Sequence, residues 1–363
     1  MADGRERAEA SVKALLLSIG LSAALASGAA AHTGDVRLRV DPPTRAELTR
    51  PGGAVHDAVV RASPRTPSLR LAGSWWGGRY STSTGESVVI YTSEAYAQDE
   101  RANQTLADFL AGLVHGRELS RLTVYVAPLA LLETMCGATG IAGCYVPARE
   151  TMVVPGHDVE SGPTVAQVVA HEYGHHVATN RVNTPWRAVD WGTKRWSSYV
   201  GICAAVASGE LSPGDEGEGY ELNPGEGFAE AFRVLNEVRA GATSVAWPIV
   251  DDRFFPDATA LESIALDVTE PWRTTTRTVV RGSFSSAGAN VRRIAIATPL
   301  DGRFRVTLRA PAGRARLELL APDGTVVGRG ASVSRTVCGQ RTVSARVTRV
   351  GAPGPFSLEI TKP

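Results

Sequence analysis

The chain contains a short segment in which two histidines and a glutamate lie in a pattern suited to metal chemistry. His171, Glu172 and His175 form the sequence His-Glu-x-x-His. On a helix, residues four apart lie on the same face, so His171 and His175 can offer two imidazole nitrogens to one metal ion. Glu172 lies beside them and could take a proton from a water on that ion. The pattern therefore indicates a metal site with an adjacent general base.

The surrounding residues predict the helix that this pattern requires. Thr164 and Gln167 have the spacing of a capping box, with the threonine at the N-cap. Apolar side chains then recur at helical spacing and would bury one face, and Asn180 is suited to end the helix. The alternative is a surface helix that carries these residues without a metal. Against it, three of the seven histidines in the chain fall within six residues.

A catalytic zinc site needs a third protein ligand, and a later segment offers one. One common pattern places a histidine six residues after His175, but that position is Arg181. Glu226 and Glu230 lie four apart on a second predicted helix that Asn223 can cap, so both carboxylates share one face. Two carboxylates on a half-buried face are costly unless a cation lies near them, and a metal ion with its histidines would supply that charge.

The two segments together resemble the gluzincin zinc metallopeptidases, in particular the family of the anthrax lethal factor catalytic domain. The likeness rests on His171-Glu-Tyr-Gly-His175 and, about fifty residues later, on Glu226-Gly-Phe-Ala-Glu230-Ala-Phe. It covers residues 171–233. The resemblance implies a Zn²⁺ ion held by His171, His175 and Glu226, with Glu230 bonded to a ligand histidine.

The same resemblance implies roles for two further residues. Glu172 would act as the general base. Relatives have an upstream tyrosine that helps to stabilise the oxyanion, and Tyr220 is the candidate, although its spacing from the second motif differs by one residue. A tyrosine without such a role is the alternative. Gly227 departs from the bulky residue usual at its position, which concerns packing rather than ligation.

The first 72 residues are expected to lie outside the folded domains. Residues 1–31 have the features of a signal peptide, because a basic residue precedes an apolar run that ends in a small-x-small cleavage pattern. A retained membrane anchor is the alternative, although the run is weakly hydrophobic for a span. Residues 32–72 contain five prolines and are expected to form a linker or a propeptide. Within it, Asp41 or His56 could plug an active site.

Residues 73–273 are predicted to form a zincin-like metallopeptidase domain. Residues 87–92 and 122–126 have the composition of strands, and residues 103–114 have helical periodicity. A hairpin over residues 145–154 comes just before the metal helix. As an exposed sheet edge it could hold a substrate backbone by strand addition; an interior hairpin is the alternative.

The four cysteines indicate disulfides in an exported chain. Cys136 and Cys144 bracket a glycine-rich loop and suit a short-range bridge. Cys203 and Cys338 would then tie the catalytic domain to the C-terminal domain. Four cysteines allow three connectivities, and four free thiols in a cytosolic protein are the alternative.

An acidic, glycine-rich stretch over residues 215–221 lies between the two motifs. Hard oxygen ligands cluster there, so calcium binding is one interpretation. Its spacing matches no known calcium loop, and a solvated connector is the interpretation that we favour.

Residues 274–363 are predicted to form an antiparallel β-sandwich. Short alternating segments are separated by Pro-Ala-Gly, Pro-Asp-Gly and Gly-Ala-Pro-Gly turns. No histidine or carboxylate cluster in this stretch suggests chemistry, so an accessory module is expected. The expected fold class is therefore α+β, a zincin-like domain followed by the sandwich.

These observations together predict a secreted, zinc-dependent endopeptidase that hydrolyses protein or peptide substrates. The chain has 363 residues and a net charge of +1, which gives no basis for nucleic-acid binding. No stable membrane insertion is expected after signal cleavage, and a monomer is expected. Two alternatives remain: a zinc hydrolase of a non-protein amide or a cell-wall peptide, and a secreted binding protein with an inactive metal site.

Overall fold

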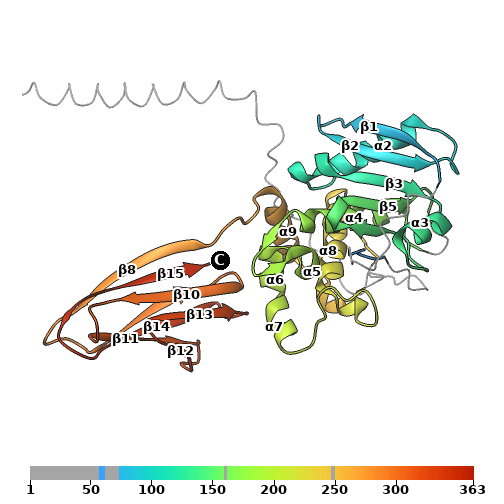
Figure 1. The fold of residues 1–363 in the computed structure, drawn as a ribbon. Coiled ribbons are helices and arrows are strands. Elements are labelled where there is room, and N and C mark those ends of the chain that lie inside the picture. Colours follow the sequence, from blue (N-terminus) through green and yellow to red (C-terminus); the bar gives the residue numbers. More distant parts are fainter. Residues whose placement is uncertain (1–56, 62–72, 159–161, 247–249) are drawn as a thin grey trace, which may run out of the picture. The chain divides into compact units, whose positions relative to one another are not determined.

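The computed structural model describes residues 57–61, 73–158, 162–246 and 250–363. Helices and a mixed sheet come first, and antiparallel sheets come last, so the predicted α+β class is confirmed (Figure 1). The predicted signal peptide, together with Asp41 and His56, lies outside the described residues.

The first region is built on a five-stranded sheet whose edge matters for the site. Its strand order is β1-β2-β3-β5-β4. The β2, β3 and β5 strands run parallel, whereas the β1–β2 and β5–β4 pairs are antiparallel. The bounds are β1 (Trp75–Ser81), β2 (Ser87–Ser93), β3 (Thr123–Ala127), β4 (Cys144–Val146) and β5 (Thr151–Pro155).

The predicted hairpin over residues 145–154 is present as β4 and β5, and only its first strand lies at the edge. The β5 strand lies between β3 and β4, and all five of its residues are buried. A strand buried on both faces reads as a continuous apolar run, which Met152 to Val154 provides. The β4 strand is last in the order of the sheet, but all three of its residues are buried and Tyr145 pairs with Val59, so the expected exposed edge is not free in this structure.

Helices and short 3₁₀ turns complete the first region. The helix predicted over residues 103–114 begins earlier, at Glu100, because the Asp99 side chain accepts hydrogen bonds from two amides of its first turn. The helices are α2 (Glu100–Gly112), α3 (Leu129–Cys136), α4 (Val165–Thr179), α5 (Ala188–Trp191), α6 (Lys194–Val200), α7 (Ile202–Ala207), α8 (Pro224–Arg239) and α9 (Ala258–Thr269). The 3₁₀ turns are η2 (Arg117–Arg121), η3 (Pro147–Arg149), η4 (Tyr220–Leu222) and η5 (Asp252–Phe254), and a small hairpin joins β6 (Val182–Asn183) to β7 (Trp186–Arg187).

Both helices that carry the motifs begin where their sequences predict, and α4 also ends where its sequence predicts. The Thr164 hydroxyl accepts from the Gln167 amide at 3.3 Å, and the Gln167 side chain accepts from the Thr164 amide at 3.0 Å, which completes the capping box. Asn180 is the C-cap of α4. Asn223 caps α8 through the Gly225 amide.

Glycines let α4 and α8 lie against each other and against their neighbours. A Cβ at Gly174 would lie 2.8 Å from the Ala229 Cα, so α4 and α8, which lie side by side in Figure 1, approach closely at this point. A Cβ at Gly227 would lie 2.4 Å from the Phe254 ring. That ring therefore fills the space which a bulky residue would need, and this explains the departure noted at Gly227.

The C-terminal region consists of two four-stranded antiparallel sheets, ordered β13-β10-β15-β8 and β12-β11-β14-β9. Side chains from both sheets form one hydrophobic core, as expected of a sandwich. Its strands are β8 (Thr276–Phe284), β9 (Val291–Ala297), β10 (Gly302–Arg309), β11 (Ala315–Leu320), β12 (Val326–Arg329), β13 (Ser332–Val337), β14 (Thr342–Arg349) and β15 (Gly354–Lys362).

Both predicted disulfides are present. Cys136 is bonded to Cys144 and Cys203 to Cys338, and no cysteine is free. The alternative of four free thiols is therefore wrong, and the two bridges fit an oxidising compartment. Within the described residues, none of the helices combines the length and the apolarity needed to cross a bilayer.

Candidate metal centre

Four buried side chains bring possible metal ligands together. His171 and His175 come from α4, Glu226 from the first turn of α8, and Asp57 from the segment 57–61. One ligand atom from each residue lies within 4.8 Å of the others. Two imidazoles and two carboxylates can hold a divalent cation. The cluster therefore could hold a metal ion.

The distances show how tightly the four groups converge. Glu226 Oε2 lies 3.2 Å from His171 Nε2 and 3.0 Å from His175 Nε2. Asp57 Oδ2 lies 2.9 Å from the first nitrogen and 3.2 Å from the second. Because both nitrogens face the same two oxygens, a single central cation could satisfy all four groups, which suits a metal site.

The carboxylates also favour protons on the imidazoles. Burial alone would lower both imidazole pKa values, but Asp57 raises the pKa of His171 well above its ordinary value. The carboxylate of Glu226, with Asp57, raises the pKa of His175 to about 10 against the same effect of burial. Protons and a cation therefore compete for these nitrogens, as they do at metal sites in general.

Glu172 lies beside the cluster, and the loop that contains Gly143 covers its side chain. Neither of its oxygens has a hydrogen-bond partner among the described residues, and its side chain is fully buried. Burial, together with the charges of Asp57 and Glu226, raises its pKa well above the ordinary value. A Cβ at Gly143 would lie 2.3 Å from Glu172 Oε1, so only a glycine lets the loop pass this close. Unpartnered buried carboxyl oxygens at this place fit a nearby ion and its water.

Glu230 connects the cluster to a buried arginine. Its Oε2 accepts from His171 Nδ1 at 3.0 Å, and Arg233 donates to both of its oxygens at 2.9 and 2.7 Å. Burial would raise the pKa of Glu230, but the Arg233 charge and the His171 bond hold it at about 2. The carboxylate therefore stays ionised and keeps the His171 proton on Nδ1, which directs the Nε2 lone pair into the cluster.

Tyr220 lies next to the cluster through Asp57. It is buried in η4, its hydroxyl donates to Asp57 Oδ1, and the Asp57 amide lies 3.5 Å from the same hydroxyl. Burial and the Asp57 charge raise its pKa well above the ordinary value, so the phenol keeps its proton. The structure thus brings together every residue proposed from the sequence: His171, Glu172, His175, Tyr220, Glu226 and Glu230.

The third histidine of α4 faces elsewhere. His176 Nε2 donates to the Glu118 carbonyl at 2.9 Å, so its Nδ1 accepts from the Tyr145 hydroxyl at 3.0 Å. Burial lowers the pKa of His176 to about 4, so this ring is neutral. Its contacts hold α4 against β4 and η2 rather than binding a ligand.

Asp57 is the cluster residue that the sequence did not reveal. The predicted plug residues in this stretch were Asp41 and His56, whereas the described cluster contains the next residue, Asp57. It lies more than a hundred residues before His171, and no spacing pattern links the two. The only signal was its place in a predicted propeptide.

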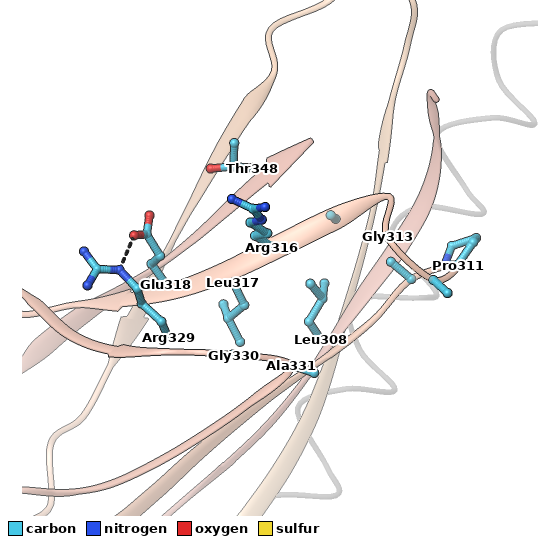
Figure 2. A pocket seen from close by; sticks show the side chains of 13 residues that line it. Leu308, Pro311, Gly313, Arg316, Leu317, Glu318, Arg329, Gly330, Ala331 and Thr348 are labelled. Carbon is cyan, nitrogen blue, oxygen red and sulfur yellow. Dashed lines mark hydrogen bonds and ion pairs between the residues drawn. The ribbon is translucent and has the colours of Figure 1, made fainter. Parts of the chain in front are cut away.

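A hollow with a volume of about 600 Å³ lies on the β-sandwich. Figure 2 shows the side chains that line it, among them Leu308, Leu317 and the pair formed by Glu318 and Arg329 at 2.9 Å. Its lining has one carboxylate, already paired, and no imidazole. The hollow therefore offers no group for acid–base or metal chemistry.

Comparisons with known proteins leave the family open. No model of a known protein family matches the chain, and no curated protein matches it. The solved structures with similar parts include a periplasmic inhibitor of g-type lysozyme from Aeromonas hydrophila, with 12% identity over 24% of this chain and 84% of that chain at a TM-score of 0.20. They also include the Yersinia pseudotuberculosis-derived mitogen, with 13% identity over 24% of this chain and 86% of that chain at a TM-score of 0.21. A third is the pre-peptidase C-terminal domain of a Bacillus anthracis collagenase, with 12% identity over 23% of this chain and 88% of that chain at a TM-score of 0.19. At such TM-scores these likenesses carry no argument about function.

Proposed function

We propose that the protein is a zinc-dependent endopeptidase with a zincin-like catalytic domain. The observation that carries this proposal is the position of Glu226 Oε2, within 3.2 Å of both His171 Nε2 and His175 Nε2. Glu172 lies on the same helix, one residue after His171 and three residues before His175. Two nitrogens and one carboxylate, with an adjacent acid, form the donor set of a hydrolytic zinc site. Zinc suits this mixture of imidazole and carboxylate ligands.

The proposed roles follow from the contacts of each side chain. A bound zinc ion would polarise the scissile carbonyl and lower the pKa of a water. Glu172 would accept the proton of the attacking water and return it to the leaving amine. Glu230, held by Arg233, would orient the His171 ring. Tyr220 would donate a hydrogen bond to the oxyanion once Asp57 no longer takes it.

A peptide substrate is favoured because an edge strand lies beside the cluster. The β4 strand already pairs with an extended backbone at Val59, and its Tyr145 ring stacks 6.4 Å from the His175 ring. A hydrolase of a cell-wall peptide would use the same edge, so substrate profiling separates the two. Because disulfides persist in oxidising surroundings, the two bridges support the proposal that the protein acts outside the cell.

The Glu172→Gln variant tests the proposal. Since Asp57 takes one of the four positions, the comparison is made in the Asp57→Ala background as well as in the unaltered chain. Replacing Glu172 should leave the zinc content unchanged and lower hydrolysis of casein by about 10²–10⁴-fold, the usual contribution of a general base. Zinc is measured by atomic absorption and hydrolysis by release of soluble peptides.

A matched control is Glu262→Gln, which changes an exposed glutamate on α9. It should alter neither zinc content nor turnover. Full turnover in the Glu172 variant would remove that residue from the mechanism. A zinc-loaded Asp57→Ala chain without any hydrolysis would favour the binding protein with an inactive site.

A further inference from the structure

The segment 57–61 lies along the cluster and makes a contact at almost every residue. Asp57 provides the fourth possible ligand, and Tyr220 donates to its second oxygen. At the other end Arg61 donates to Asp190 at 2.7 Å and to Glu216 at 2.8 Å. Five extended residues cover roughly 13 Å, so one short stretch bridges the metal centre and this acidic pair.

Between these ends the backbone adds to the sheet. Val59 forms a parallel bridge with Tyr145 of β4. The Tyr145 amide donates to the Ala58 carbonyl at 3.0 Å, and the Val60 amide donates to the Tyr145 carbonyl at 2.8 Å. The Val59 amide donates in the other direction, to Glu216 Oε2 at 3.1 Å. Alternate amides therefore bond to the strand and to Glu216, as in strand addition by a bound peptide.

The side chains of the segment match their surroundings. Ala58 and Val60 pack against the apolar cluster that includes Val146 and Val153. Arg61 meets two carboxylates, and these bonds raise the pKa of its guanidinium against the effect of burial. A carboxylate faces the imidazoles, apolar side chains face apolar ones, and a cation faces two anions.

The contacts at Asp57 conflict with catalysis as long as they persist. A hydrolytic metal site needs one open position for water or substrate. With His171, His175 and Glu226 as ligands, the Asp57 carboxylate takes that position, and it also engages the Tyr220 hydroxyl. The segment therefore blocks both groups that a substrate carbonyl would need.

We propose that the groove formed by the β4 edge, Asp190 and Glu216 is a binding site for an extended peptide with a basic side chain, and that residues 57–61 are its intramolecular occupant, which keeps the protein self-inhibited. This inference rests on the proposed function, because inhibition has meaning only for an active site. The acidic pair gives the groove a preference for arginine or lysine four residues beyond the group at the metal. Activity then requires that the segment leave the groove.

The main test severs the segment within the full chain. A site for a sequence-specific protease is inserted between Pro67 and Ser68, and the chain is cut and diluted to micromolar concentration. Linkage gives the segment an effective concentration on the order of millimolar, so cutting and dilution to micromolar should reduce the ratio of occupied to free groove by about 10³-fold. Casein hydrolysis should rise accordingly, and a synthetic peptide of residues 55–63 should suppress it again.

Peptide binding gives a readout that does not need activity. The fluorescently labelled peptide should bind the cut chain, and it should bind the cut Glu172→Gln chain equally well. A peptide with Arg61→Glu should bind at least about tenfold more weakly, because two charge-assisted hydrogen bonds are lost. Fluorescence anisotropy measures all three affinities.

Variants of the uncut chain keep the proposal testable if the cut protein aggregates. Arg61→Ala should raise hydrolysis without changing zinc content, because Arg61 touches neither the cluster nor Glu172. Arg277→Ala is the matched control, since it removes an exposed arginine that pairs with Glu359 on the sandwich. It should leave hydrolysis unchanged.

The outcomes separate this inference from the proposed function. If the peptide binds but neither the cut chain, the uncut chain nor any variant hydrolyses casein, the binding groove is retained and the proposed peptidase function is rejected. Hydrolysis that is unchanged by cutting, with no peptide binding, rejects the inhibitory segment and retains the peptidase. Loss of zinc on cutting or in Asp57→Ala, without a gain in turnover, makes Asp57 a permanent ligand and overturns the inference.

Discussion

The interior around α4 and α8 is charged, whereas the core of the C-terminal sandwich is apolar. On α8 alone, Glu226, Glu230 and Arg233 are all at most 2% exposed. The sandwich core consists of aliphatic and aromatic side chains from both sheets, and the polar residues buried in that region, Thr298 and Asp301, lie between β9 and β10. The side chains in the two interiors are buried to a similar degree, but those of the first include charged groups and those of the second are apolar.

This difference shows where the molecule accepts a cost in stability. Burying apolar side chains is favourable and sets few constraints on their exact placement. Burying a charge is costly unless a partner compensates it, and removal of one partner leaves an uncompensated charge. The cluster, Glu172 and the Glu230–Arg233 pair are therefore the part of the molecule where the proposed chemistry would offset such a cost, whereas the sandwich core only stabilises the fold.

The largest effect is expected at the cluster itself. His175→Ala should weaken zinc binding by more than about 100-fold, beyond the usual effect of losing an outer partner, because a ligand is removed. Competition with a chromophoric chelator measures the affinity. His157→Ala, which removes a ring bonded to the Tyr96 hydroxyl, is the control. Equal affinities in the two variants would contradict the assignment.

The sandwich should respond in stability alone. Phe304 is fully buried in β10, so Phe304→Ala should lower the free energy of unfolding by about 3–5 kcal/mol. Denaturant unfolding followed by tryptophan fluorescence and circular dichroism measures this loss. Zinc affinity should not change, and a parallel fall in affinity would show that the two regions do not act independently.

A smaller effect is expected where the loop covers Glu172. The Cβ of Gly143→Ala would lie 2.3 Å from Glu172 Oε1 and 2.8 Å from Val168 Cγ1. Such overpacking costs about 1–3 kcal/mol. We expect kcat to fall while zinc affinity is retained. Gly112→Ala, where a Cβ meets nothing within 4 Å, should leave kcat unchanged.

The dependence of zinc affinity on pH should be the most gradual effect. Glu226 and Asp57 outweigh burial and raise the pKa of His175 to about 10, so this ring carries a proton when no cation is bound. A cation must displace that proton, and affinity should therefore rise with pH between 5 and 9. The expected slope is about tenfold per pH unit for each proton displaced. A flat profile from chelator competition would contradict proton competition at the imidazoles.

Local sequence patterns predicted much of the α4 and α8 geometry. The capping box of Thr164 with Gln167 and the cap of Asn223 depend on neighbouring residues, and both are present. Glu226 and Glu230 share a face because of helical spacing, and the pairing of the helices then brings both to His171. The four cysteines also pair as expected, since few connectivities were available.

What could not be predicted depends on contacts between distant segments. Asp57 reaches the cluster through strand pairing at Tyr145, which no periodicity in the sequence reports. Residues 215–221 were predicted to be a solvated connector, which is wrong for Glu216, because it is partly buried and bonds to Arg61. Phe254 lies over Gly227 because η5 packs against α8. The sequence of α8 alone gives no information about this contact.

The bridge between Cys136 and Cys144 constrains two neighbouring parts of the site at once. Gly143, which lies over Glu172, directly precedes Cys144, and Cys144 begins β4. A thiol reductant should therefore loosen both the loop that covers Glu172 and the β4 strand. Because this bridge forms only where thiols are oxidised, the loop over Glu172 and the β4 strand would be held in place together only in an oxidising compartment.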